Sequence, residues 1–357
     1  MRRQTSGRQA TCLLLIVLTG WSLTMSAADG RDGWIALLLA CVCSLPLAAL
    51  CCLPAERVPV GSWFDLPGAV FGKGCGGVYL AALAALSFWS LCMAVLGGVI
   101  FLRTVSGGEW PVWLLAAAIL LCAGAAAQDG IGRLVLWAEP VVWVVVLALA
   151  VSLALSVRQM DWAQLWPVLA RGWTGMPYRS VLLLSVPFGE VFYAAAALGG
   201  TGGAQVRTGL LRACVLAGVL LCLLYVRNLC MLGQEGAAQV LYPSYTAASL
   251  LEFGKSFQRG EVLISGSLIV CTVARAALLL QFWGESVQAA TGRCSGRQAV
   301  WGGAAIAGGV CVLTAGSNRA FAEALHLYQL VLFPAVFAAA VLLLAGVWWK
   351  NRAGRTP

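Results

Sequence analysis

Long apolar segments recur along the whole chain, and they constrain its fold more than any other feature. Ten of these segments have about the length, roughly 20 apolar residues, that a helix needs to cross a bilayer. Hydrophobic residues make up 61% of the 357 residues, and charged residues make up only 10%. A water-soluble domain needs a largely polar exterior, so it could not cover this much apolar surface. The sequence predicts an all-α integral membrane protein.

The predicted spans are separated by short polar or charged connections. We place them at about residues 9–28, 34–54, 77–102, 111–128, 134–156, 180–199, 207–233, 261–290, 298–315 and 325–349. The first span follows three arginines and so resembles a signal peptide, but its apolar stretch continues past Gly20, and we interpret it as retained. The two longer connections, 157–179 and 234–260, are predicted to contain amphipathic helices at the membrane surface.

Basic residues are distributed unevenly between the two sides of these spans. An even number of spans puts both termini on one side, and alternate loops assign thirteen basic residues to that side and eight to the other. Because loops rich in lysine and arginine stay in the cytoplasm, both termini are predicted to be cytoplasmic. The net charge of +9 is then explained by topology and by lipid head groups, and we expect no nucleic-acid partner.

Motifs typical of enzymes and metal sites are absent from the sequence. It contains no glycine-rich phosphate loop and no metal-ligand cluster, and its single histidine, His326, lies near the end of a span. Most of the fourteen cysteines fall inside apolar segments, where cysteine behaves as a small apolar side chain. We therefore expect a protein that is not an enzyme and that holds no cofactor or metal.

The sixth span is interrupted by residues that are costly inside a membrane. It contains the sequence LLLSVPFGEVFYAAAAL, residues 182–198. Pro187 lacks a backbone donor and Gly189 loosens the backbone, so the span should divide into two half-helices near the membrane midplane. Many secondary transporters hold a small solute at such half-helix ends. Two interpretations remain: a solute site that includes Glu190, or a simple proline kink that Glu190 caps.

The first span has a weaker counterpart, Thr19-Gly20-Trp21-Ser22, which is either a second helix break or only a close helix contact. Its position favours the break, because an inverted repeat of five plus five spans would bring the first and sixth spans together at the midplane. The two repeats would be residues 9–156 and 180–349 of a single transmembrane domain, residues 1–357.

Several other charged residues fall within the predicted spans. Charged side chains inside a membrane normally face the bundle interior and have partners there. Arg275 lies near the middle of the eighth span, and Glu190 is a plausible partner for it. Glu139 and Arg227 lie closer to span ends, where snorkelling or a local structural pair is expected.

Short motifs along the chain resemble one family of membrane proteins in their order and spacing. Ser185-Val186-Pro187-Phe188-Gly189-Glu190 resembles the S-F-P-F-G-E stretch of the endospore germination permeases, the B subunits of GerA-type spore germinant receptors. Tyr242-Pro243, followed by Arg259-Gly260-Glu261, resembles their Y-P…R-x-E connection. Arg275 falls where many members carry a basic residue, and residues 33–36 resemble the start of their second span. The resemblance covers essentially the whole chain.

The resemblance implies membership of the amino acid–polyamine–cation transporter superfamily, with a LeuT-type 5+5 inverted repeat in which helices 1 and 6 are broken. It also implies a sensor of a small nutrient, often an amino acid, in the spore inner membrane. Such a sensor would act with an A subunit and a lipoprotein C subunit. The alternatives are an amino-acid or cation-coupled permease and a membrane scaffold with a degenerate pocket.

The candidate ligand-binding residues lie on the first, sixth and eighth spans. They are Thr19, Gly20, Trp21, Ser22, Ser185, Pro187, Phe188, Gly189, Glu190 and Arg275. Among them, Glu190 is expected to matter for the response to ligand more than for folding, because its charge would serve the cavity rather than helix packing.

Overall fold

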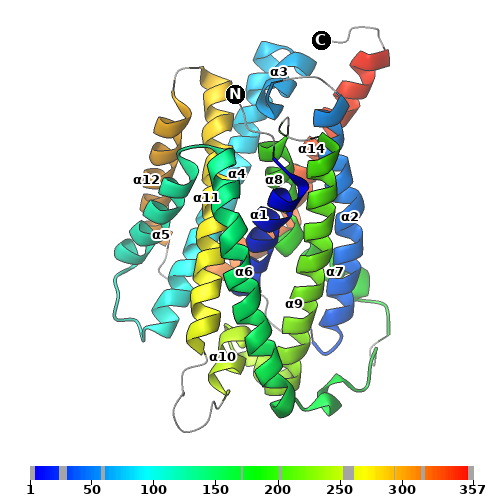
Figure 1. Ribbon diagram of the computed structural model, residues 1–357, viewed down its shortest axis with the longest axis vertical. Coiled ribbons are helices and arrows are strands. Elements are labelled where there is room, and N and C mark those ends of the chain that lie inside the picture. The colour runs from blue at the N-terminus through cyan, green and yellow to red at the C-terminus, as the bar shows by residue number, and fades with distance from the viewer. Residues whose placement is uncertain are drawn as a thin grey trace.

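We describe the fold from a computed structural model, which defines residues 5–23, 30–57, 61–169, 172–199, 201, 203–251, 261–292, 294–314 and 318–352. Every regular element in these residues is a helix (Figure 1). Each predicted span contains at least one helix. Seven helical segments in the described residues are both long and apolar enough to cross a membrane. Two further apolar helices, Gly7–Thr19 and Val112–Ala127, are shorter.

The helices follow the predicted spans in chain order. The first five spans hold α1 (Gly7–Thr19) with the 3-10 turn η1 (Gly20–Leu23), α2 (Gly33–Arg57), α4 (Lys73–Val105), α5 (Val112–Ala127) and α6 (Ile131–Ser156). The other five hold α7 (Met176–Phe188) with α8 (Val191–Leu198), α9 (Gly203–Gln239), α11 (Glu261–Thr291), α12 (Gly296–Thr314), and α13 (Asn318–Leu327) joined by the π-helix η7 (Tyr328–Leu332) to α14 (Phe333–Arg352). Between α2 and α4 lie η3 (Trp63–Asp65) and α3 (Leu66–Phe71).

The two longer connections differ from each other in structure. In its described residues, 157–169 and 172–175, the first forms only two 3-10 turns, η4 (Val157–Gln159) and η5 (Trp162–Leu165), before α7 begins, so the helix predicted there is wrong. Its tryptophans supply the apolar character that suggested a helix, and they are exposed rather than packed. The second connection does contain a short helix, α10 (Pro243–Ser249), and residues 252–260 lie outside the described residues.

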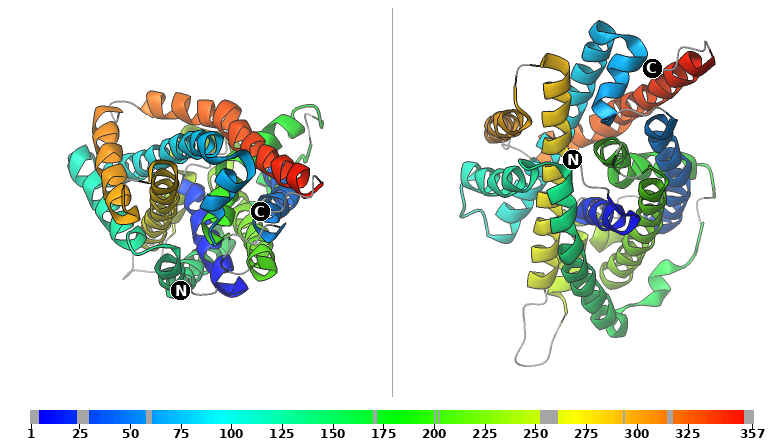
Figure 2. Two further views of the ribbon diagram at one scale, coloured as in Figure 1. Left: turned by 90° about the horizontal axis from the view of Figure 1, so that it is seen from above. Right: turned by 45° about the horizontal axis from the view of Figure 1, so that its top comes forward.

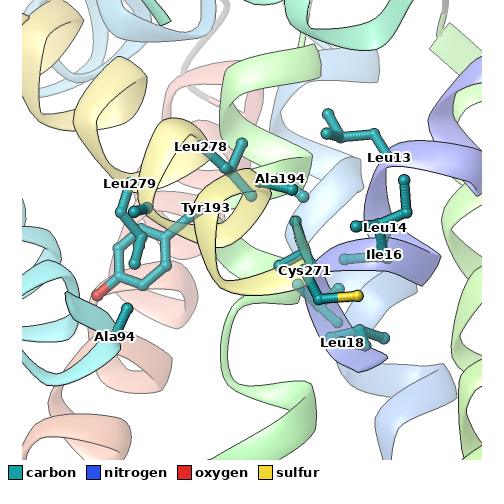
Figure 3. Packing of buried hydrophobic residues seen from close by; sticks show 14 of the residues in the cluster. Leu13, Leu14, Ile16, Leu18, Ala94, Tyr193, Ala194, Cys271, Leu278 and Leu279 are labelled. Carbon is teal, nitrogen blue, oxygen red and sulfur yellow. The ribbon is translucent and has the colours of Figure 1, made fainter. Parts of the chain in front are cut away.

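Helix α1 occupies the centre of the bundle. Figures 1 and 2 show it between α6 and α9, and every side chain from Leu13 to Leu18 is buried. In Figure 3 the residues of α1 lie close to Cys271 of α11, with Ala194 of α8 nearby. A helix that is apolar on all sides needs apolar surroundings. Protein supplies most of them here, because α1 packs against α6, α9 and α11.

Small residues allow the central helices to approach each other closely, as is common in membrane bundles. A Cβ atom on Gly209 of α9 would lie 3.0 Å from the Cβ of Ala10 in α1. At the same contact the Thr11 hydroxyl donates to the carbonyl of Gly209 at 2.9 Å. On the other side of the bundle α4 packs along α11, and a Cβ on Gly98 would lie 2.9 Å from Cγ2 of Thr272.

Helix α1 begins, and α14 ends, on the same side of the molecule. The first turns of α1 lie against the start of α9. Arg207, also at the start of α9, forms an ion pair of 3.0 Å with Glu56, near the end of α2. Lys350, close to the end of α14, donates to the carbonyl of Ala69 in α3, which follows α2. We call this side the terminal face and the opposite side the distal face.

We predict that the terminal face is cytoplasmic, as the distribution of basic residues indicates. Cys294 tests this, because it is exposed just beyond Ala290, which lies beside Gly77 at the start of α4. A membrane-impermeant maleimide should leave Cys294 unlabelled in intact cells and should label it after permeabilisation, as read by peptide mass spectrometry. The control variant Glu109→Cys, exposed on the distal face, should be labelled in both conditions. The reverse pattern would invert the assigned topology.

Candidate functional site

The sixth span is interrupted where the sequence predicts. Helix α7 ends at Phe188 and α8 begins at Val191, with Gly189 and Glu190 between them. Pro187 has no N–H to donate to the preceding turn, so one helical hydrogen bond is lost there. Gly189 (φ −61°, ψ −25°) and Glu190 (φ −80°, ψ −7°) nevertheless keep right-handed helical geometry. The interruption is therefore a tight break between two half-helices rather than an extended segment.

The first span also changes conformation at the predicted glycine. Helix α1 ends at Thr19 and continues as the 3-10 turn η1 from Gly20. Gly20 lies directly on α11, where a Cβ atom would come within 3.3 Å of the Cβ of Cys271. Gly20 is thus a close helix contact, but it is not only that, because the irregular turn of the first span also starts there. The side chain of Ser22 lies outside the described residues.

Three predicted residues from three spans meet at these interruptions. The Arg275 Nε donates to Glu190 Oε1, which confirms that Glu190 is the partner of Arg275. The Glu190 side chain is completely inaccessible and that of Arg275 is 5% exposed. The guanidinium carbon of Arg275 also lies 3.5 Å from the ring centroid of Trp21, a cation–π contact that gains strength away from water. We call Trp21, Glu190 and Arg275 the charged centre.

The charged centre has hydrogen-bonding capacity that the described residues do not use. Glu190 Oε2 and Arg275 Nη2 are both buried and have no hydrogen-bond partner among those residues. An unsatisfied buried polar group costs about 1–3 kcal/mol, and more when it is charged. One acceptor and one donor, of opposite charge and on adjacent side chains, are thus available to a polar ligand.

Two tyrosines that the sequence reasoning missed adjoin the charged centre. Tyr193 in α8 is fully buried, and Tyr328 in η7 has its ring centroid 6.3 Å from that of Trp21. Both tyrosines lie near Ser90 of α4, and the Tyr193 hydroxyl has no hydrogen-bond partner among the described residues. Tyr193 could have been identified from its position three residues after Glu190, which places it on the same side of a helix.

The signal for Tyr328 was weaker. It lies six residues before Pro334, and a proline within a span indicates a locally irregular helix. The observed irregularity is the π-helix η7, a type of turn that often marks functional sites. A Cβ on Gly189 would lie 3.2 Å from the Tyr328 hydroxyl oxygen, so the irregular segments of the sixth and tenth spans pack together.

The other predicted site residues lie near the breaks without joining the charged centre. The hydroxyl groups of Thr19 and Ser185 donate to carbonyls one turn earlier in their own helices, at 2.7 Å each. Pro187 is buried, and the Phe188 ring points towards α9, where it lies 3.7 Å from the position of a Cβ on Gly218. These four residues shape the half-helices, and their role in ligand binding stays a prediction.

Arg227 has the structural environment, one of the two that the sequence left open. It is fully buried, so the expectation of snorkelling is wrong, and the alternative of a local structural group is correct. Its guanidinium donates to Ser152 of α6 at 2.9 Å, to Asn228 of α9 at 2.8 Å and to the carbonyl of Ser244 in α10 at 2.9 Å. The arginine thereby ties three helices together. Glu139 pairs with Arg8 at 3.1 Å.

A cluster of aromatic rings separates the charged centre from the terminal face. Its members, which we call the aromatic plug, are Trp63 and Phe64 of η3, Phe192 and Tyr193 of α8, and Phe282 of α11. Ring centroids lie 5.7 Å apart for Trp63 and Phe192, and 4.9 Å apart for Tyr193 and Phe282. Figure 3 shows Tyr193 beside Leu278 and Leu279 of α11. Since Tyr193 borders the charged centre and Trp63 comes from the terminal face, the plug closes the centre on that side.

Comparisons with known proteins give both a family and a fold. A family model described as "Spore germination protein" matches residues 6–289. No curated protein matches the chain. Among solved structures, the transporter MhsT in complex with L-phenylalanine has a TM-score of 0.67 at 13% identity, covering 96% of this chain and 90% of that one. A substrate-bound, Na⁺-coupled sialic acid symporter has a TM-score of 0.67 at 12% identity, with coverages of 94% and 78%. A manganese transporter from Eremococcus coleocola has a TM-score of 0.57 at 17% identity, with coverages of 96% and 77%.

At these identities the structural matches speak for the fold alone. They confirm the predicted all-α membrane fold of the LeuT type, with a 5+5 arrangement in which the first and sixth helices are broken. The proteins of similar fold and the matched family are transporters and germination proteins rather than enzymes. Because the family model spans most of the sequence, as its motifs predicted, the chain belongs to the spore germination protein family.

Proposed function

We propose that this protein is the B subunit of a spore germinant receptor and that it senses a zwitterionic nutrient, an amino acid by class, at the charged centre. The single observation that carries this proposal is the buried Glu190–Arg275 pair, in which each member has an unused position. Membership of the spore germination protein family and the transporter fold support it. The site would lie in the spore inner membrane, with both termini cytoplasmic.

The chemistry of the pair favours a ligand that carries both charges. An α-ammonium group can donate to Glu190 Oε2, and an α-carboxylate can accept from Arg275 Nη2, in charge-assisted hydrogen bonds. A ligand with only one charge would leave Arg275 or Glu190 without compensation, at a cost of several kcal/mol. The face of Trp21, now covered by Arg275, could contact the ligand once the arginine moves.

Signalling follows from the way the pair joins two helices. Glu190 lies at the start of α8, and Arg275 lies on α11, so a ligand inserted between them changes how these helices pack. A ligand shifts a conformational equilibrium only by its difference in affinity for the two states. Here the difference arises because the joined pair offers a ligand only Glu190 Oε2 and Arg275 Nη2, whereas a separated pair also offers the two atoms that now bond each other. The A and C subunits would read this shift.

The second candidate function is an amino-acid or cation-coupled permease. The transporter fold favours it, because solved proteins of similar fold carry solutes across membranes. A permease must open towards both sides, so the aromatic plug would have to separate in every transport cycle. A sensor needs no such opening. Uptake of a radiolabelled amino acid by proteoliposomes that contain only this chain would support the permease.

Binding by the purified full-length chain tests the proposed site. A panel of the standard amino acids is screened by thermal shift, and each hit is compared with its methyl ester, a cation, and its N-acetyl derivative, an anion. At least one amino acid should stabilise the protein, and both derivatives should bind at least about tenfold more weakly, about 1.4 kcal/mol. No stabilisation by any amino acid, or equal binding of the derivatives, would refute the charged centre as a zwitterion site. Co-purification with the A and C subunits tests the receptor assignment separately.

A further inference from the structure

A groove distinct from the charged centre runs along the outer surface of the bundle. It has a volume of about 1240 Å³ and lies between α6 and α9, with α1 as its floor. Thr11, Cys12 and Leu15 supply that floor. No residue of the charged centre lines it, so the proposed nutrient site does not account for it.

The walls of the groove are apolar over a length that suits a lipid chain. Along α9 the lining residues recur every three or four positions from Thr208 to Leu223, which places them on one face of the helix. The apolar part of that face runs from Val215 to Leu223, and eight residue steps at about 1.5 Å each give roughly 12 Å. One leaflet of a bilayer has about 15 Å of hydrocarbon, half of a core of about 30 Å. The opposite wall includes Val142, Trp143 and Val146 of α6. The Trp143 side chain is 61% exposed on the outer surface of the bundle.

The polar lining is confined to one end of the groove. Arg8 and Arg212 lie there, together with the hydroxyl-bearing Thr11 and Thr208. This end is on the terminal face, where α1 and α9 both begin. Arg212 is exposed and makes no ion pair or hydrogen bond with any described residue. Arg8 uses its Nε for Glu139 and remains 66% exposed, so the end of the groove is positively charged and accessible.

We propose that this groove binds an anionic glycerophospholipid. One acyl chain would lie between α6 and α9 over α1, and the phosphate would sit between Arg8 and Arg212. Basic pockets between transmembrane helices are suited to anionic head groups, and each basic residue near the surface contributes about fivefold in affinity, about 1 kcal/mol. The apolar length excludes a free phosphate as the natural occupant, since it would leave the walls unused. The charged end distinguishes this groove from surface that any lipid covers.

The proposal is tested by lipid binding to the full-length protein in detergent, measured by native mass spectrometry. Dioleoyl phosphatidylglycerol is compared with dioleoyl phosphatidylcholine, and glycerol 3-phosphate serves as a probe without acyl chains. The wild type should prefer the anionic lipid at least about tenfold and should show no measurable binding of glycerol 3-phosphate. Arg212→Gln should lower that preference about fivefold, and Arg212→Lys should retain it. Arg133→Gln is the matched control, because Arg133 is an exposed arginine on α6 that pairs with Asp129 and does not line the groove.

A variant with the opposite sign sharpens the test. Glu139→Gln removes the carboxylate that holds Arg8, so it should raise the preference for phosphatidylglycerol. The proposal is overturned if the two lipids bind equally, if Arg133→Gln weakens the preference as much as Arg212→Gln does, or if Glu139→Gln lowers it. Binding of glycerol 3-phosphate as tight as that of the lipid would also overturn it, because the apolar groove would then contribute nothing.

Discussion

Neutralising one member of the Glu190–Arg275 pair should lower the stability of the protein by about 3–5 kcal/mol, whereas neutralising both should restore most of that loss. The reason is that Glu190→Gln leaves Arg275 as an unpaired charge in a site closed to solvent, and Arg275→Gln does the same to Glu190. In the double variant no buried charge remains. The sequence alone suggested that Glu190 matters for response more than for folding. Because the pair is buried, we now expect the Glu190 carboxylate to matter both for the response to ligand and for folding.

Thermal unfolding of the purified variants in lipid measures this effect, and the Arg207–Glu56 pair supplies the control. Its side chains are 37% and 20% exposed, so Arg207→Gln should change stability by no more than about 1 kcal/mol. The double variant should fold yet fail to respond to the amino acid identified for the wild type. A double variant as unstable as the single ones would show that charge compensation is not what the pair provides. A normal response of the double variant to the amino acid would show that the pair is not part of the ligand site.

Removing the Trp63 side chain should open a path for water from the terminal face towards the charged centre. Trp63 is 1% exposed and contacts both Phe64 and Phe192, so Trp63→Ala leaves a large cavity at a cost of about 3–5 kcal/mol. Water entering this cavity would reach the backbone of α8, which carries Phe192 and Tyr193 of the plug and begins directly after Glu190. Hydrogen exchange of the α8 amides, Val191–Leu198, should therefore accelerate at least about tenfold, the change that 1.4 kcal/mol of local destabilisation produces.

The matched control for this experiment is Trp113→Ala, because Trp113 in α5 is 60% exposed and lies outside the aromatic plug. It should leave exchange in α8 unchanged. If Trp63→Ala destabilises the protein without faster exchange in α8, the plug stabilises the fold but does not seal the centre. If both variants accelerate α8 equally, the effect reflects global unfolding.

The fold could be read from the sequence because the membrane imposes few solutions. A span must satisfy its backbone groups internally, so each apolar segment of sufficient length predicts a helix. The charged centre was also readable in part. A carboxylate and a guanidinium in mid-span are so costly that they need partners, and Glu190 and Arg275 were the charges nearest the middle of the sixth and eighth spans.

The remaining features depend on packing that a single sequence does not display. Tyr193, Tyr328 and Trp63 are aromatic residues within or beside apolar segments, where composition does not distinguish a ring in a site from a ring facing lipid. The break at Gly189 was predicted. The sequence did not show that Tyr328 and Phe333 would pack directly against this glycine and fill the space beside it. In the connection after α6, apolar tryptophans among polar residues indicated an amphipathic helix, but the structure leaves these tryptophans exposed.

The neutrality of the buried pair has a consequence for the membrane voltage. Moving one elementary charge through 100 mV changes the free energy by about 2.3 kcal/mol. Glu190 and Arg275 together carry no net charge, and neither does a zwitterion that replaces their mutual contact. To first order, binding therefore moves no net charge through the electric field across the bilayer. A receptor of this design would have the same affinity in an energised membrane and in one whose potential has collapsed.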